Sequence, residues 1–527
     1  MANKNLFGSI AGKLLAKPDA VNEANGPAYA FAPKHALAQY VATGCLNSTF
    51  YASAEEQLSA VLRFCGEVET GFIAKTAIFC RERGRMKDAP ALLCAVLAGR
   101  DTKLLEKIFP RVIDNAKMLR NFVQMIRSGV TGRKSLGTAP KRMVLDWLEA
   151  RSEEALFAAS VGQSPSLGDV IKMVHPKPGA PGREALYAYL IGRSGHAEAL
   201  PEIVRDYEAF KAGETLTVPK VPFAMLTALP LGKFDWIEIA RNALWQATRM
   251  NLNTFARHGV FGDGSAASDE QVEVTKIVAQ RLRDREMIAK ARAFPYQLMV
   301  AYANSEARVP DVVKEALQDA MEVALENVPS VAGKVYVLPD VSGSMHSAVT
   351  GNRGTATTAV RCIDVAALVA AAMLRKNPDA EVLPFNDKVV PVALNRRDSV
   401  MTNAVKLAAL PQGGTNCSAP LAYLNQHKAQ GDMVIYVSDS QSWVDAANAK
   451  TRGTATMKEW NRFKSRNPQA RLVCIDIQPY STTQAAERDD ILNVGGFSDQ
   501  VFETIAEFGA GRLAPEHWVS VIESIET

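Results

Sequence analysis

The stretch that decides the fold class is Val331–Met345, VAGKVYVLPDVSGSM, in which a β-rich apolar run passes directly into a polar loop. Further runs of strand length follow, namely AEVLPFN, KVVPVAL, DMVIYVSDS and ARLVCIDIQ, and helical segments such as TATMKEWNRFKSRNP alternate with them. Apolar strands that alternate with helices are typical of a parallel, doubly wound α/β sheet. We therefore expect an α/β domain over residues 331–527, with its boundary near Pro329-Ser330.

Oxygen-bearing side chains stand in three loops of this expected domain. Asp340, Ser342 and Ser344 follow the first strand, Thr415 precedes a helix after Gly413-Gly414, and Asp439 ends the strand MVIYVSD. Ligands of open α/β sheets bind beyond the carboxyl ends of the strands, so we expect the loops to converge. Carboxylate and hydroxyl oxygens suit a hard divalent cation, with Mg²⁺ as the first choice and Mn²⁺ or Ca²⁺ as alternatives.

A catalytic interpretation of the same loops is less well supported. A phosphatase of the haloacid-dehalogenase type needs a second Asp two residues after the first, and Ser342 occupies that position. The sequence contains no G-x-x-x-x-G-K-[ST], G-x-S-x-G or H-E-x-x-H motif, and we interpret His346 as a solvated loop residue. We therefore predict a binding site without catalytic residues, and a metal-dependent hydrolase stays the least favoured reading.

The preceding part of the chain has helical periodicity from about residue 30 to 328. Segments such as SAEEQLSAVLRFCGEV, GFIAKTAIFCRERG and NAKMLRNFVQMIRSG place apolar residues at i, i+3, i+4 and i+7. Short breaks with Gly, Asp or Pro separate them, which favours antiparallel helix pairs of the HEAT or armadillo type. We expect residues 1–330 to form an all-α helical-repeat module with degenerate repeats.

Composition places the chain among ordinary globular proteins, with 47% apolar and 22% charged residues in 527. The net charge is only +4, but residues 101–150 carry ten basic and five acidic residues. An anionic partner is therefore expected on the helical part. Aromatic residues make up 7% of the chain, which favours binding of a nucleic-acid backbone over reading of its bases.

Cysteine usage and hydropathy bear on the compartment. The seven cysteines are odd in number and none is spaced C-x-x-C, which argues against zinc ribbons and disulfides and fits a reducing cytosol. No stretch approaches a membrane span, and the N-terminus has no clear secretory signal. We expect a cytoplasmic protein without a membrane partner.

Three basic clusters are candidate phosphate contacts. The first flanks a glycine-rich turn, the second surrounds a helix end and an H-P-K-P turn, and the third lies on one segment. If that segment is a continuous helix, spacing of four puts Arg249, Asn253 and Arg257 on one face. The candidates are Lys134, Lys141, Arg142, Lys172, His175, Lys177, Arg249, Arg257 and His258.

DVSGSM together with GGT and VSDS resembles the von Willebrand factor A domain and its metal-ion-dependent adhesion site. The resemblance implies that Asp340, Ser342, Ser344, Thr415 and Asp439 bind the cation directly or through water. It also implies that a partner's carboxylate often fills a sixth position. Pro339, in place of the usual apolar residue, is a departure that leaves these ligands untouched.

A helical array joined to such a domain resembles the Ro ribonucleoprotein family, known by its TROVE module, in a bacterial Ro-like form. Residues 43–51, 174–178, 249–258 and 292–296 are similar to segments of that module. The segment VGQSPSLGD, before the second cluster, lacks basic groups expected from vertebrate members, so RNA affinity there is expected to be weaker or differently distributed.

The Ro resemblance implies a monomer whose helical repeats form a ring with a basic central hole. Single-stranded ends of misfolded RNA enter the hole, and a small structured noncoding RNA, Y RNA, binds the outer surface. An exoribonuclease is a further candidate partner in noncoding RNA quality control. The alternative is a metal-dependent adhesion or assembly factor with a peptide-binding solenoid.

Overall fold

The computed structural model describes residues 17–527 apart from 44–45, 85, 194–196, 263–266, 292, 294, 326–327, 329, 352–359, 444–452, 479, 497–499 and 512–516. The chain divides into two compact units. The helical unit contains Glu69–Ala293, Gln297–Val323 and Glu526–Thr527, and the sheet unit contains the chain up to Val68, Phe294–Tyr296 and Ala324–Ile525. Residues 17–68 thus pack with the sheet, so the units do not coincide with the predicted segments 1–330 and 331–527.

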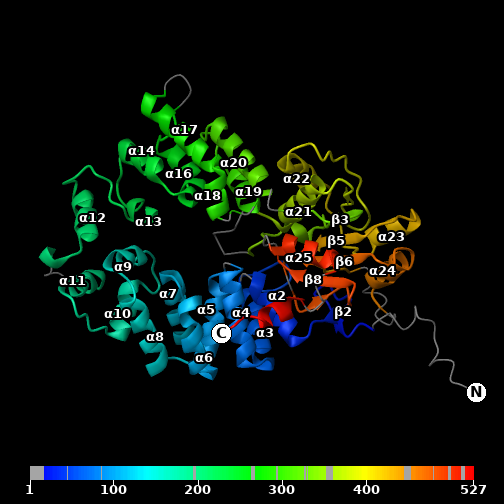
Figure 1. Cartoon of the computed structure of the whole chain (residues 1–527), viewed down its shortest axis with the longest axis horizontal. Coiled ribbons are helices and arrows are strands. Elements are labelled where there is room, and N and C mark those ends of the chain that lie inside the picture. The colour runs from blue at the N-terminus through cyan, green and yellow to red at the C-terminus, as the bar shows by residue number, and fades with distance from the viewer. Residues whose placement is uncertain are drawn as a thin grey trace, which may run out of the picture. The chain divides into compact units, whose positions relative to one another are not determined.

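The helical unit consists of short helices, as the periodicity predicts (Figure 1). Capping side chains determine where several helices begin. Asp101 accepts a hydrogen bond from the Leu104 N–H, and Asn115 accepts one from the Met118 N–H. Neighbours such as α4 and α5, α5 and α7, and α10 and α11 pack together through their apolar faces. The helices are α4 Thr70–Glu82, α5 Asp88–Arg100, α6 Thr102–Val112, α7 Ala116–Arg127, α8 Thr138–Glu149, α9 Glu153–Ala159, α10 Leu167–Val174, α11 Pro181–Leu190, η2 Ala197–Ala199, α12 Glu202–Ala212, α13 Phe223–Leu226, α14 Lys233–Asn242, α15 Trp245–Met250, α16 Leu252–Arg257, α17 Asp269–Arg283, α18 Arg285–Ala291, α19 Pro295–Ala303 and α20 Asp311–Ala324.

The sheet unit is built around a parallel sheet of order β4-β3-β5-β6-β8. The first strand of this sheet, β3, lies between the second, β4, and the third, β5, so the order reverses between β3 and β5. Such a switch point is where doubly wound sheets bind ligands. The elements of this sheet and its helices are β3 Val335–Pro339, η5 Ser344–His346, α21 Cys362–Lys376, β4 Glu381–Val382, α22 Val400–Ala408, α23 Ala419–Gln426, β5 Met433–Ser438, α24 Ala455–Arg466, β6 Arg471–Asp476, β8 Ile491–Gly495, α25 Gln500–Gly509 and α26 His517–Glu523.

Both faces of the sheet are buried, which explains why its strands are continuous apolar runs. Tyr336 and Leu338 of β3 pack into a core with Trp460 and Phe463 of α24. Val335 and Val337 alternate with them and are buried on the opposite face, where α21 packs on β3 and β5. The predicted α/β class is confirmed.

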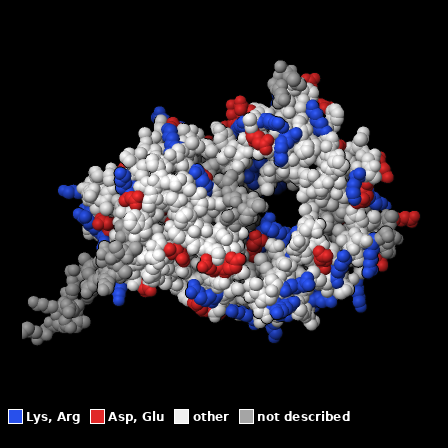
Figure 2. All heavy atoms as spheres, turned by 180° about the vertical axis from the view of Figure 1, so that it is seen from behind, with Lys and Arg blue, Asp and Glu red and all other residues white. Residues whose placement is uncertain are grey.

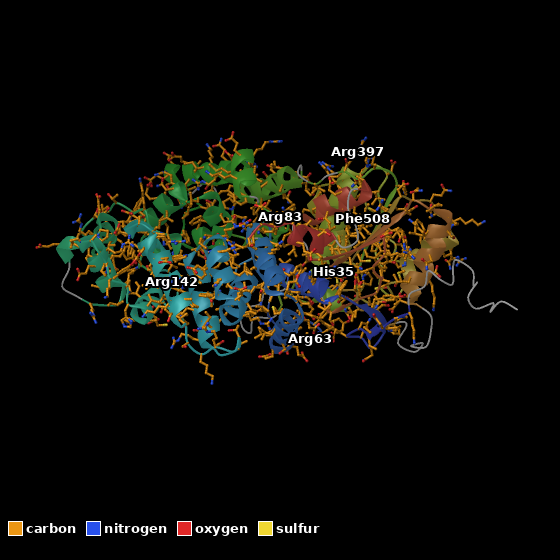
Figure 3. All side chains as sticks on the ribbon, turned by 60° about the horizontal axis from the view of Figure 1, so that its bottom comes forward. His35, Arg63, Arg83, Arg142, Arg397 and Phe508 are labelled. Carbon is orange, nitrogen blue, oxygen red and sulfur yellow. The ribbon has the colours of Figure 1, made fainter. Side chains whose placement is uncertain are left out.

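The N-terminal part of the sheet unit adds a small antiparallel sheet and two helices. In the small sheet β2 pairs with both β1 and β7. His35 of α2, labelled in Figure 3, is buried beside Glu487 and joins this part to the sheet domain. The elements are β1 Ala20–Val21, β2 Pro27–Ala30, α2 Pro33–Thr43, α3 Ala54–Glu67 and β7 Thr482–Thr483.

Two details of the predicted sheet are wrong. KVVPVAL forms no strand in the described structure: Val389 makes an isolated bridge to Phe385, and Pro391, which has no N–H, interrupts the run. The strand β8 was not expected, because Asn493 and Gly495 break its apolar run. Pro329 of the predicted domain boundary lies outside the described residues.

No described helix is both long and apolar enough for a membrane span. Of the seven cysteines, Cys45 lies outside the described residues; the others are buried free thiols, as predicted: Cys65, Cys80, Cys94, Cys362, Cys417 and Cys474.

Candidate metal centre and nucleic-acid interface

The first predicted metal loop turns sharply at the end of β3. Asp340 accepts a hydrogen bond from the Ser342 N–H at 2.8 Å, which folds the loop back over the carboxylate. The hydroxyls of Ser342 and Ser344 then lie 3.3 Å apart. The alternate spacing of the two serines therefore places both oxygens on the same side as the Asp340 carboxylate.

The other two loops reach the same edge of the sheet. The Gly343 N–H donates to the Gly413 carbonyl at 3.0 Å, which joins the first loop to the one that carries Thr415. The Ser438 hydroxyl, at the end of β5, donates to Asp340 at 2.6 Å, immediately before Asp439. The sheet thus brings together the three loops that hold the predicted ligands.

The two carboxylates of this centre are buried and repel each other. Asp340 is 0% exposed and Asp439 is 3% exposed. Burial, followed by the charge of Asp439, raises the pKa of Asp340 to about 7. Burial also raises the pKa of Asp439. Two ionised carboxylates at this depth need a compensating charge, and a divalent cation supplies one. The donor set therefore fits the predicted ion.

A third buried carboxylate lies beside the centre. Asp476, the last residue of β6, accepts a hydrogen bond from the Ser440 hydroxyl, while its other oxygen has no hydrogen-bond partner within the described structure. Burial is the main cause that raises the pKa of Asp476 to about 7. Its position at the end of the run ARLVCID was the available signal, since the adjacent strands end at the same edge.

The candidate metal centre depends on hydroxyl donors as well as on carboxylates. Among the described residues, no group of three or more His, Cys, Asp or Glu side chains is placed to hold a metal ion. The centre instead combines two carboxylates with the hydroxyls of Ser342, Ser344 and Thr415, which are 0%, 5% and 4% exposed.

The first basic cluster surrounds a hollow between α7 and α8. Lys134, Lys141 and Arg142, the last labelled in Figure 3, line it together with Arg127 of α7. Its volume is about 800 Å³, and its lining of described residues includes four cations and no carboxylate. Figure 2 shows Lys and Arg gathered along the lower edge of the face it presents, near α6 to α8. Arg127 was not predicted; its place in the last turn of α7 was the only signal.

Arg142 is partly engaged on the surface. Its guanidinium contacts Glu106 at 2.7 Å, and both side chains are about half exposed. Exposed ion pairs of this kind contribute little to stability, and the arginine can exchange its carboxylate partner for another anion. Arg142 therefore remains available to a phosphate group.

The second basic cluster is at a helix end, as predicted. α10 ends at Val174, and His175 follows in the left-handed conformation with φ of 53°. Lys172 and His175 are exposed, whereas Lys177 lines a separate hollow that also contains Glu149 and Glu153. The cluster is thus more spread out, and more neutralised by acids, than the one beside α8.

The third basic cluster corrects a prediction. The segment is not a continuous helix: α15 ends at Met250, α16 begins at Leu252, and Asn251 between them has φ of −121° and ψ of 17°. Arg249 and Arg257 therefore do not share one helical face.

The side chains of this third cluster are largely used within the helical unit. Arg249 donates to the Gln297 carbonyl at 3.0 Å. Arg257 is exposed and lies 4.0 Å from Glu306, and the His258 ring stacks on Trp236 at 4.2 Å between centroids.

Comparison with known proteins agrees with both units. Residues 334–509 match the family model described as Ro60 vWA domain. The chain is 24% identical over 535 aligned positions to the RNA-binding protein RO60 of Deinococcus radiodurans, which covers 93% of this chain and 95% of that protein. The crystal structure of the Deinococcus radiodurans RO (RSR) protein matches 92% of this chain and 100% of its own, with a TM-score of 0.60 and 21% identity.

The predicted resemblance to Ro proteins is confirmed. The Ro60-type domain model coincides with the parallel sheet and the metal loops, and the structural match extends through the helical unit. The Ro fold thus accounts for a helical array and an A domain in one chain.

Proposed function

We propose that this chain is an RNA-binding component of a ribonucleoprotein, with no catalytic role, whose helical unit holds RNA through its phosphates. The observation that carries the proposal is the hollow beside α7 and α8, whose described lining includes Arg127, Lys134, Lys141 and Arg142 and no carboxylate. Cations in a concave surface attract a polyanion and give affinity with little sequence preference. The name of the Deinococcus radiodurans relative, an RNA-binding protein, supports the proposal.

The finer parts of the proposal follow the Ro resemblance. We infer that the RNA partners are a small structured Y-like RNA, held on the outer surface, and misfolded RNAs whose single-stranded ends enter a basic hole. This would place the chain in cytoplasmic noncoding RNA quality control as a monomer, with an exoribonuclease as a further partner.

The sheet unit has a separate proposed role, which is to bind a divalent cation. Mg²⁺ is the first choice, and Mn²⁺ or Ca²⁺ are the alternatives. Asp340, Ser342, Ser344, Thr415 and Asp439 would hold the ion, since they are buried oxygen donors on converging loops. When bound, the cation would neutralise the buried carboxylates and order the loops.

Binding of labelled RNA to the purified full chain across a salt series tests the RNA function. The probes are a structured small RNA, a duplex with a 3′ single-stranded tail and the same duplex with blunt ends. We expect log affinity to fall linearly with log salt, with a slope of about −3 if four cations contact a single strand. The tailed duplex should bind more tightly than the blunt one. Absence of affinity for all three RNAs at low salt would refute the proposal.

A chelator separates this function from the adhesion alternative. RNA affinity should be the same within about twofold in EDTA and in Mg²⁺, because the basic hollow and the metal loops belong to different units. Nuclease-resistant capture of a protein that is lost in EDTA would instead favour adhesion.

A further inference from the structure

A second, smaller hollow of the helical unit lies at the other end of α7, and we call it the Arg120 pocket. Arg127, in the last turn of α7, lines the basic hollow described above, whereas Asn115, the N-cap residue of the same helix, lines the Arg120 pocket. Its volume is about 410 Å³. The charged residues of its described lining are Lys87, Lys117, Arg120 and Arg151 against the single carboxylate of Asp114.

Arg120 is a buried cation without a counterion. It is 9% exposed, and within the described structure its guanidinium forms no ion pair with a carboxylate. Its Nη1 donates to the Val161 carbonyl, whereas a guanidinium has five N–H donors. Burial lowers the pKa of Arg120. Because a buried charge without a partner is costly, an anion that enters the pocket is stabilised most strongly at this side chain.

The segment VGQSPSLGD, which contains no basic residue of its own, holds the Arg120 guanidinium in place. Gly162 has φ of 112°, and a Cβ at this position would lie 2.4 Å from Arg120 Nη2 and 2.7 Å from its Cζ. A larger residue would displace the guanidinium, so the backbone can lie against it only at a glycine. The segment thus contributes to the pocket by positioning a cation that belongs to α7.

Arg151, the second arginine of the pocket, is also held in one orientation. Its Cζ lies 3.4 Å from the centroid of the Trp147 ring. Its guanidinium donates to the Trp147 carbonyl at 2.8 Å and to the Asp114 carbonyl at 3.0 Å. Two guanidinium groups that are fixed before a ligand arrives lose little conformational entropy when they bind it.

The carboxylate of the described lining is neutralised by an arginine outside the pocket. Asp114 accepts hydrogen bonds from Nε and Nη2 of Arg81 at 2.9 and 2.6 Å, and one from the Asn115 side-chain amide at 2.7 Å. Lys117 lies 3.5 Å from Asp88, but both side chains are about half exposed, so this pair is weak. The excess of positive charge is therefore available to a ligand.

We propose that the Arg120 pocket binds a phosphate group, which its two arginines hold through charge-assisted hydrogen bonds and its two lysines through charge. The planar fork of a guanidinium matches the spacing of phosphate oxygens. The positive end of the α7 dipole, at Asn115, favours the same ligand. The phosphate group belongs to a free nucleotide or to an RNA chain. The site is separate from the basic hollow and does not depend on the RNA function, because inorganic phosphate is a sufficient ligand.

Titration of the full chain with inorganic phosphate, followed by phosphorus NMR line widths at constant ionic strength, tests the site. We expect Arg120→Gln to lower phosphate affinity about tenfold or more, since it removes a charged hydrogen-bond donor. The double variant Lys87→Ala, Lys117→Ala should lower it about three- to tenfold. The matched control Lys103→Ala, Lys107→Ala removes two exposed lysines of α6 outside the pocket lining and should stay within about twofold of wild type.

Competition distinguishes the two sources of the phosphate group. The competitors are AMP, adenosine, and one single-stranded oligoribonucleotide with either a 5′-hydroxyl or a 5′-phosphate. Displacement of inorganic phosphate by the 5′-hydroxyl form assigns the pocket to the RNA backbone. Displacement by AMP but not by that form assigns it to a terminal phosphate, of an RNA end if the 5′-phosphorylated form also competes and of a free nucleotide if it does not. Adenosine should displace nothing, and competition by adenosine equal to that by AMP would refute recognition of phosphate.

The remaining outcomes decide whether the pocket exists as a binding site. Wild-type phosphate affinity in Arg120→Gln and in the pocket double variant would overturn the proposal. Equal losses in the pocket and control double variants would overturn it too, because general surface charge would then determine binding. Circular dichroism shows whether each variant is folded, and the exposed lysines keep the test decisive if Arg120→Gln does not fold. Phosphate binding by a chain that binds no RNA would refute the proposed function alone.

Discussion

The hollow of the helical unit carries exposed positive charge, whereas the candidate metal centre of the sheet unit carries buried negative charge. Lys134 and Arg142 are exposed around an open hollow, while Asp340 and Asp439, which directly follow β3 and β5, are 0% and 3% exposed. Exposed cations are solvated, and they can exchange water or a weak ion-pair partner for the phosphates of a long polyanion. Buried carboxylates carry a large desolvation cost and need one compensating ion at a defined place. From this contrast we predict two separate activities: salt-sensitive binding of RNA at the hollow and binding of one cation at the candidate metal centre.

Substitution of a buried carboxylate that is proposed to bind the cation should have the largest effect, a loss of metal affinity. It should leave RNA affinity unchanged. We expect Asp340→Ala to weaken Mn²⁺ binding by about 100-fold or more, because even residues outside the ligand set change metal affinity by up to that factor. Titration of Mn²⁺ by electron paramagnetic resonance measures this. Asp379→Ala, an exposed carboxylate of the same unit, serves as the control. Wild-type Mn²⁺ affinity in Asp340→Ala would contradict the metal centre.

Substitution of the exposed basic residues around the hollow should have the next largest effect, a loss of RNA affinity. We expect the triple variant Arg127→Ala, Lys134→Ala and Lys141→Ala to weaken RNA binding about 10- to 100-fold at low salt and to make the salt slope shallower by about 2. Fluorescence anisotropy with a tailed RNA measures both quantities.

The matched control for this variant removes three exposed cations of the sheet unit, Lys388, Arg397 and Lys428. It should keep RNA affinity within about threefold of wild type, since it changes net charge equally without touching the hollow. Equal losses in the two triple variants would mean that net charge, and not this hollow, determines binding.

The smallest expected effect distinguishes two arginines within the helical unit. Arg249 donates to the Gln297 carbonyl, so Arg249→Ala should lower the free energy of unfolding by about 1–2 kcal/mol and leave RNA affinity unchanged. Arg257→Ala removes an exposed side chain and should cost less than about 0.5 kcal/mol. Urea unfolding followed by circular dichroism compares them. A larger loss of unfolding free energy in Arg257→Ala than in Arg249→Ala would contradict the view that Arg249 is the structural residue of the two.

The parts of the fold that depend on local pattern were predictable from the sequence. The apolar periodicity of α3 to α7 and the passage from β3 into DVSGS determine those elements locally. The break at Asn251 was missed because helical spacing alone does not report where two short helices meet. The two-residue strands β1 and β7 exist only through their pairing with β2, which no local pattern encodes.

The residues of the candidate sites also divide into those that local sequence pattern predicts and those that only tertiary packing brings together. The spacing D-x-S-x-S and the strand ends predicted that the candidate metal residues would lie together, because parallel strands deliver their carboxyl ends to one edge. Arg127 and Lys141 belong to different helices, yet both line the same hollow. Such neighbours arise from tertiary packing, so residue type and spacing alone could not assign them.

Photocrosslinking of a tailed RNA that carries 4-thiouridine, followed by mass spectrometry of the crosslinked peptides, tests the central claim most directly. The account predicts crosslinks within residues 127–142, around the hollow of the helical unit, in Mg²⁺ and in EDTA alike. Crosslinks concentrated on residues 340–344 or 413–415 of the metal loops, and lost in EDTA, would contradict it.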